Sequence, residues 1–270
     1  MQHKTRVTAL VAAAIAAPLM ASSALAQNVG DIQVSITNEG NSDFFLTPMW
    51  FAFQNGTFDL FDTGSAASPA LEALAEDGIV DGLTADFASS GVPGNRQGVA
   101  ANADGFGGAP VIDPGETATA FVVPINPAAY QYFTFASMVI PSNDTFIGNG
   151  DPFAHQVFNG AGDINDASGT FTIQVFGSDL YDAGTEVNDA NGAAFSALGG
   201  TSSDEGGVVN QNVDLSNFLG TPTAAGTTIL DGIDSGELLA TIEISFVPVP
   251  SPATAAVLGL PALALVRRRR

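Results

Sequence analysis

The chain has 270 residues, a formal net charge of −21 at pH 7 and no cysteine. Seven basic residues against 28 acidic ones exclude a nucleic-acid-binding surface, because phosphates are held by lysine and arginine. The lack of cysteine excludes disulfides, thiolate metal sites and a cysteine nucleophile. Hydrophobic residues make up 46% of the chain, with 19 phenylalanines among them, which indicates a protein with a buried core rather than a disordered one.

The first residues have the layout of an export signal. Lys4 and Arg6 precede an apolar run at residues 7–17, and the small residues Ala-Leu-Ala follow at 24–26. A basic start, an apolar middle and a small-residue exit are typical of a secretory signal peptide. The alternatives are a buried first helix or a membrane anchor, but the apolar run is shorter than the ~20 residues that span a bilayer. We therefore expect a signal peptide at residues 1–26.

Alternation of apolar and polar residues predicts most of the strands. Ile32, Val34 and Ile36 fall on one face of the first candidate, opposite three polar residues. The run YFTFASMVI is apolar on both faces and predicts a central strand. The strands predicted in this way are residues 31–38, 48–53, 117–123, 132–140, 171–176 and 239–246.

Residues typical of helix ends predict one helix, and a second, shorter helical turn follows it. Ser68 can cap the helix, Pro69 suits its first turn, and Gly78 can end it. A second turn of helix is expected at residues 83–88. Strands dominate, so the fold class is all-β: an antiparallel β-sandwich with one or two short helices in its connections. We expect one domain at residues 27–247, with long surface loops at 94–110 and 188–207.

Five strings in this body resemble the spondin N-terminal domain of bacterial secreted proteins. They are FDLFDTG at 58–64, ASPALEALAEDG at 67–78, PGET at 114–117, FASMVIPSNDTFIG at 135–148 and YDAGTEVN at 181–188. The resemblance implies a β-sandwich similar to calcium-dependent lipid-binding domains, and the domain binds calcium in animal matrix and adhesion proteins. One departure is Gln54, where such proteins often have histidine.

The residues themselves also contain candidate calcium ligands. Asp144 follows the predicted central strand, and Asp182, Glu186 and Asp189 lie in a turn after another strand, with Asp151 as a supplement. Calcium takes six to eight oxygen ligands, so these five residues are the expected metal ligands if the two turns meet. The alternative is that these acids only bond the backbone of their own turns, as aspartate commonly does.

Other groups of residues give weaker evidence for metal binding or catalysis. Residues 163–169 begin like a calcium-binding EF-hand loop but lack its glycine at position six and its final glutamate, so they predict a plain loop. His155 is the only histidine between the two terminal segments, which excludes a two-histidine zinc site and favours a structural role. A pair of carboxylates could cleave glycans, although the single tryptophan and three tyrosines offer few sugar platforms.

The C-terminal residues have the order of segments that is typical of a protein sorting signal. A proline-rich step with Pro-Ser-Pro at 250–252 precedes an apolar run at 253–266 and four arginines at 267–270. Residues 248–270 resemble the PEP-CTERM sorting signal of exopolysaccharide-producing bacteria, with serine in place of its central glutamate. The alternatives are a tail anchor or a terminal helix of the fold. Without both terminal segments, residues 27–252 hold one basic residue and 28 acids, a net charge of 1 − 28 = −27.

These features together predict an exported, non-enzymatic binding or adhesion protein of the cell surface or extracellular matrix, with calcium as its cofactor. The expected partner is an extracellular polysaccharide or a surface protein, with no nucleic acid and only a transient membrane contact through the sorting segment. The alternative is a secreted, carboxylate-dependent glycan hydrolase.

Overall fold

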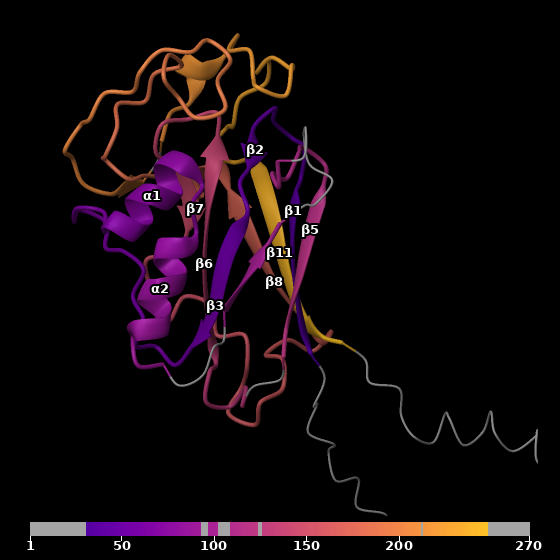
Figure 1. Ribbon diagram of the computed structural model, residues 1–270. Coiled ribbons are helices and arrows are strands. Elements are labelled where there is room, and N and C mark those ends of the chain that lie inside the picture. The colour runs from indigo at the N-terminus through magenta and orange to yellow at the C-terminus, as the bar shows by residue number, and fades with distance from the viewer. Residues whose placement is uncertain (1–30, 93–96, 102–108, 124–125, 212, 248–270) are drawn as a thin grey trace, which may run out of the picture.

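Two antiparallel sheets and two short helices form the part of the chain that the computed structural model describes, residues 31–92, 97–101, 109–123, 126–211 and 213–247 (Figure 1). The expected all-β sandwich is therefore confirmed. The signal peptide expected at 1–26 and the sorting signal expected at 248–270 lie outside the described residues. Within them, no helix has the length and apolar character that crossing a membrane requires.

The smaller sheet joins the two ends of the domain. Its strand order is β5 (Thr117–Val122), β1 (Ile32–Asn38), β11 (Leu238–Phe246) and β8 (Thr170–Phe176). Strands β1 and β11 pair from Ile32 opposite Phe246 to Asn38 opposite Ala240. All four strands were predicted, because one face of each is apolar and buried while the other carries mostly threonine, serine and glutamine.

The larger sheet has seven strands. Its order is β10 (Asn210–Gln211), β9 (Leu180–Asp182), β7 (Thr145–Gly148), β6 (Tyr132–Ile140), β3 (Met49–Gln54) and β4 (Gln97–Ala100), and β2 (Phe45–Leu46) also pairs with β6. Strands β3 and β6 were predicted. The expectation of a loop throughout 94–110 was wrong, because β4 lies within it and pairs with β3.

Both predicted helices are present, as α1 (Pro69–Asp77) and α2 (Asp81–Ser89). The Ser68 hydroxyl accepts the N–H of Leu71 at 3.2 Å, as expected of a capping residue. Gly78 ends α1 with φ 68°, a conformation that favours glycine. Two single 3-10 turns, η2 (Gly177–Asp179) and η3 (Ser216–Phe218), complete the helical elements of the described residues.

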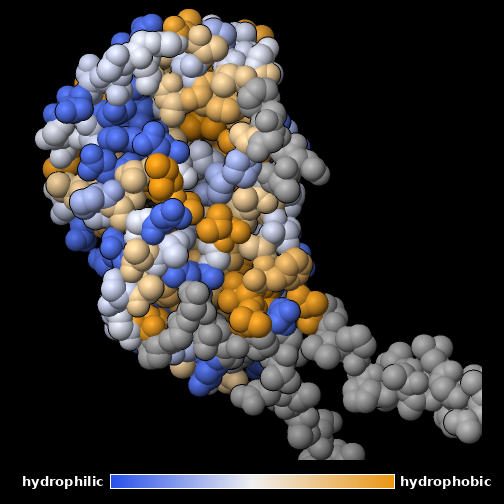
Figure 2. Space-filling model, in the orientation of Figure 1, coloured by the Kyte–Doolittle hydropathy of each residue, from blue (hydrophilic) through white to orange (hydrophobic). Residues whose placement is uncertain are grey.

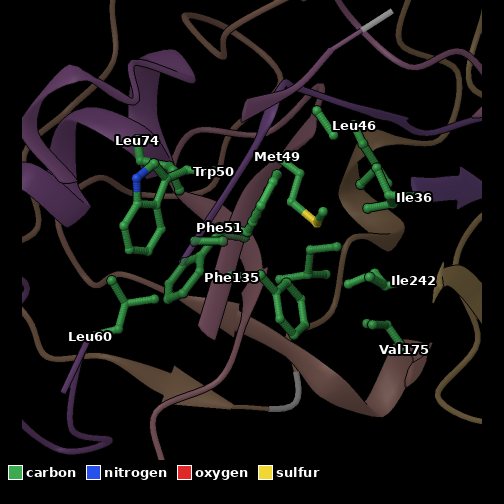
Figure 3. Packing of buried hydrophobic residues seen from close by; sticks show 14 of the residues in the cluster. Ile36, Leu46, Met49, Trp50, Phe51, Leu60, Leu74, Phe135, Val175 and Ile242 are labelled. Carbon is green, nitrogen blue, oxygen red and sulfur yellow. The ribbon is translucent and has the colours of Figure 1, made fainter. Parts of the chain in front are cut away.

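The helices cover one face of the larger sheet, and the smaller sheet covers the other. Trp50 of β3 packs against Phe87 of α2, with ring centroids 5.9 Å apart, and Figure 3 shows it beside Leu74 of α1. On the opposite face, Phe135 points toward Ile242 of the smaller sheet (Figure 3). Every residue of β3 is buried because apolar layers lie on both of its sides. The sandwich thus has a third, helical layer that the sequence did not predict.

Residues 183–209 form a long irregular segment at one end of the larger sheet, seen as orange loops at the top of Figure 1. An isolated bridge between Ser142 and Ala194 ties it to the body, and another between Glu186 and Asp204 joins two parts of the segment itself. The predicted loop at 188–207 falls within this segment. In the view of Figure 2, hydrophilic residues gather on the left, the side of the helices, and larger hydrophobic areas appear toward the lower right.

Candidate functional site

The two acidic turns meet at one end of the larger sheet. Asp144 directly precedes β7, and Asp182 is the last residue of β9. Strands β7 and β9 pair with Thr145 opposite Asp182, and the Ala183 N–H donates to the carbonyl oxygen of Asp144 at 3.1 Å. This pairing brings together two of the residues expected to bind metal.

The carboxylate of Asp144 is fully buried and accepts hydrogen bonds from the opposite turn. Its Oδ2 accepts the N–H of Thr185 at 2.8 Å and the N–H of Glu186 at 3.1 Å, and also the Thr185 hydroxyl at 3.3 Å. Its Oδ1 accepts the side-chain amide of Asn188 at 3.3 Å. Asp144 therefore orders the start of the 183–209 segment.

Asp182 shares a donor with Asp144. The Asn188 amide nitrogen also donates to Oδ2 of Asp182 at 2.8 Å, while Oδ1 of Asp182 accepts the N–H of Gly184 at 2.8 Å. Burial, and then the charge of Asp182, raises the pKa of Asp144 from 3.8 to about 6. Burial also raises the pKa of Asp182. The pair is thus costly to keep doubly ionised.

Glu186 and Asp189 brace the same segment with their side chains. The Ser202 hydroxyl donates to Oε1 of Glu186, and the N–H of Asn191 donates to Oδ1 of Asp189 at 3.0 Å. The N–H of Asp189 donates to the side-chain oxygen of Asn143 at 2.9 Å. The amide nitrogen of Asn143 is buried without a partner among the described residues, but as a donor it suits water rather than a cation.

The carboxylates of Asp144 and Asp182 do not fit a calcium ion in this arrangement. Calcium requires six to eight oxygen ligands, whereas the oxygens of both side chains already accept N–H and O–H groups. Across the described ranges, no three His, Asp or Glu side chains are grouped closely enough to hold one metal ion. The geometry at this end supports the alternative in which these acids bond the backbone.

Asp151 lies away from this group, because it follows β7 whereas Asp144 precedes it. Its Oδ1 accepts the N–H of Phe153 at 2.8 Å. Together with Asp59 and Asp62 it lines an open pocket of about 380 Å³. Burial, followed by the charges of Asp62 and Asp151, raises the pKa of Asp59. We refer to this hollow as the acidic pocket.

Sequence reasoning missed Asp59 and Asp62 as site residues. Both belong to the string FDLFDTG, which served only to mark a resemblance. Their spacing of three residues carried a signal, but nothing in the sequence places them beside Asp151, which is far away along the chain. Tertiary packing alone forms the acidic pocket.

Gln54 holds the acidic pocket in place through a hydrogen bond to Pro152, which is part of its lining. It is fully buried at the end of β3, and its amide nitrogen donates to the carbonyl oxygen of Pro152 at 2.6 Å. Its side-chain oxygen accepts the N–H of Gly56. At the position where resembling proteins often have histidine, this chain thus has an amide that fixes the loop after β7.

His155 lies in a neighbouring cleft rather than in the acidic pocket. Burial lowers the pKa of its imidazole, and the charge of Asp151 partly offsets this effect. The ring lies against Phe135, with centroids 5.9 Å apart. A neutral ring packed on an aromatic side chain fits the expected structural role.

A scan against protein-family models matches no family, and a search of the curated proteins finds no match. The resemblances to the spondin N-terminal domain and to the PEP-CTERM signal therefore stay predictions from the residues quoted for them. What the chain does is inferred from its own side chains and surfaces.

Proposed function

We propose that this protein is an exported, non-enzymatic binding protein of the cell surface or extracellular matrix, and that it takes up calcium in the acidic pocket. The export layout of the sequence supports the location. The charge of the body and the carboxylates of the acidic pocket support the cation.

The described part of the body contains no lysine or arginine that could neutralise its acidic residues. All seven lysines and arginines lie outside the described residues, at positions 4, 6, 96 and 267–270. The described residues hold 27 acids, which is the total of 28 less Asp104. A surface of this kind draws cations from solution, and divalent ions relieve the repulsion most effectively.

The carrying observation is the position of Asp59, Asp62 and Asp151. These carboxylates line one open pocket, and the pKa of Asp59 is raised by burial and then by its two neighbours. Calcium prefers carboxylate, carbonyl and water oxygens, and Thr63 and Pro152 are also part of the lining. No three of the described His, Asp or Glu side chains lie close enough to share a metal ion as they stand, so these carboxylates would have to turn toward a calcium ion, with water completing its ligands. The ion would then offset the repulsion that Asp59 experiences from Asp62 and Asp151.

The same charge restricts the binding partner. An anionic polymer is repelled unless calcium lies between it and the protein, whereas a neutral polysaccharide or a surface protein with basic groups is not. We therefore propose an extracellular polysaccharide or a surface protein as the partner.

Thermal unfolding of the purified protein in calcium and in chelator tests the cation. Calcium at a hundred times its dissociation constant stabilises the native state by about 2.7 kcal/mol, which raises the melting temperature measurably. Asp62→Asn is expected to remove the shift, and Asp214→Asn, an exposed acid outside the pocket, is the matched control. Equal melting temperatures in calcium and chelator would contradict calcium binding.

A panel of extracellular glycans, assayed for both binding and product release, separates this function from a glycan hydrolase. Binding without turnover supports the proposal. Release of sugar that disappears in Asp151→Asn or Asp59→Asn would instead favour the hydrolase, which uses paired carboxylates.

A further inference from the structure

Strand β8 lies at one edge of the smaller sheet, and among the described residues its outer side pairs with no other strand. The smaller sheet ends at β5 and β8, and the main strand order of the larger one ends at β4 and β10. Strands β4 and β5 lie against each other, and β10 has only two residues. Strand β8 has seven residues and, among the described residues, pairs only with β11 (Figure 1).

Side chains cap both ends of this edge. The N–H of Thr170 donates to the Ser168 hydroxyl at 3.2 Å, and the N–H of Phe176 donates to Oδ2 of Asp179 at 2.9 Å. These two N–H groups therefore do not point toward β11. The N–H of Gly177, the next residue, does reach the strand's partner side and donates to the carbonyl oxygen of Glu237 at 2.9 Å.

The N–H groups of Thr172 and Gln174 lie between those caps and share their direction. Alternate residues of an antiparallel strand direct their N–H and C=O groups to opposite sides. Thr172 and Gln174 are each an even number of residues from Thr170, so their backbone groups face the open edge. In the described part of the chain, neither N–H donates a hydrogen bond outside the β8–β11 ladder.

The sequence of β8 lacks the charges and prolines that commonly protect an exposed edge, and the one irregularity of its ladder lies at Leu238–Ala240 of β11. Exposed edges are normally guarded by charges, proline, bulges or covering loops. Strand β8 reads TFTIQVF, with no charged residue, proline or glycine. Such a strand is a ready template for another extended chain.

A cleft of about 340 Å³ adjoins the second half of β8, and acidic residues are part of its lining. Its lining includes Gln174 and Val175 of β8 together with Gly150 and His155 from the segment after β7. The lining also includes the carboxyl-bearing residues Asp151 and Asp179. The only basic side chain in the described residues is His155, whose pKa is lowered by burial.

We propose that the free edge of β8 accepts an extended peptide segment of a partner protein, and that a lysine or arginine of this segment lies in the cleft beside Asp151 and Asp179. Backbone hydrogen bonds to Thr172 and Gln174 supply the pairing, and the cleft selects the side chain. The charge of the body makes a second copy of the chain a poor occupant, because its own β8 carries no basic residue and brings the same two acids to the contact.

Peptide titration tests the selection for charge. The probe is a short peptide that alternates threonine and valine and carries a lysine, measured by fluorescence anisotropy with the purified protein in chelator, so that the result is independent of calcium. Saturable binding is expected. The same peptide with glutamate in place of lysine, and a version with N-methylated backbone amides, should bind at least about tenfold more weakly, as the loss of one or two hydrogen bonds or a charge pair gives.

Gln174→Pro tests the edge itself. Proline is tolerated at an edge position whose N–H points away from the sheet, so this change removes one donor without breaking the β8–β11 ladder. The dissociation constant should rise about tenfold. Asp151→Asn should also weaken the lysine peptide, while Asp214→Asn, a change of equal charge outside the cleft, should not.

Amide hydrogen exchange keeps the test decisive if Gln174→Pro fails to fold. In the free protein, the N–H groups of Thr172 and Gln174 should exchange quickly, and saturating lysine peptide should slow both at least about tenfold. Unchanged exchange at these two amides, or equal affinity for the lysine and glutamate peptides, would overturn the proposal. So would a dimer in chelator whose interface protects the same amides.

Discussion

Asp144 accepts the backbone N–H of Thr185 at 2.8 Å, joining two turns that lie 41 positions apart in the chain. Asp144 is fully buried, and its oxygens also accept the N–H of Glu186 and the amide of Asn188. This carboxylate is therefore one of the points at which the long irregular segment is fixed to the larger sheet.

Replacing Asp144 by alanine should destabilise the protein strongly. The change leaves two backbone N–H groups of the opposite turn without an acceptor in a buried place, and each such group costs about 1–3 kcal/mol. We expect a loss of about 2–4 kcal/mol in the free energy of unfolding, measured by urea denaturation. Asp214→Ala, which removes a cap from an exposed turn, is the control and should cost less than half as much.

Stability should depend on pH through Asp144. Its pKa is raised from 3.8 to about 6, so between these values the native state binds more protons than the unfolded state. The free energy of unfolding therefore falls as the pH rises through this window, and the contribution is lost above the folded pKa. Asp182, whose pKa is also raised, adds a contribution of the same sign.

Asp144→Asn should flatten this slope when urea denaturation is repeated across the window. The lowered pKa of His155 acts in the opposite direction, because the stability of a neutral histidine is lost as the pH falls below 6.5. Wild type and variant share His155, so only the difference between their slopes is compared. Identical slopes would rule out Asp144 as the source.

Gln54→Ala should loosen the loop that separates the acidic pocket from the cleft beside β8. The change deletes the donor to Pro152 and the acceptor for Gly56, at a cost of about 1–3 kcal/mol. Faster amide exchange at Phe153 is expected, and calcium affinity should fall. Gln156→Ala, an exposed glutamine bonded to Gln131, is the matched control and should change neither quantity.

Gly78→Ala should cost more than Gly64→Ala, although both glycines have positive φ angles of 68° and 87°. A Cβ atom at Gly78 would lie 2.7 Å from Cγ2 of Thr47, whereas one at Gly64 would meet nothing within 4 Å. Backbone strain of about 1–2 kcal/mol is common to both, and the clash adds to it only at Gly78. Equal free energies of unfolding for the two variants would show that Thr47 moves aside freely.

The strands that could be predicted are those long enough to show a pattern. Ile32, Val34 and Ile36 alternate with polar residues, and β6 is apolar on both faces because layers cover both of its sides. Strands β7 and β9 have only four and three residues, too few for a period of two to stand out. Strand β4 contains Gly98 and one large apolar residue, so its place at the sheet edge is set by pairing with β3.

The candidate site was predictable only in part. The positions of Asp144 and Asp182 directly after predicted strands indicated that they could meet, and they do. The hydrogen bonds that both carboxylates accept from the amide of Asn188 depend on side-chain geometry that no spacing encodes. Asp151 was grouped with them, but it lies beyond the opposite end of β7, beside Asp59 and Asp62.

Isothermal titration of calcium into the purified wild-type protein and into Asp62→Asn tests calcium uptake by the acidic pocket most directly. The account predicts a saturable heat of binding in the wild type that is lost in Asp62→Asn and preserved in Asp214→Asn. A wild-type titration without saturable heat, or one that Asp62→Asn leaves unchanged, would contradict it.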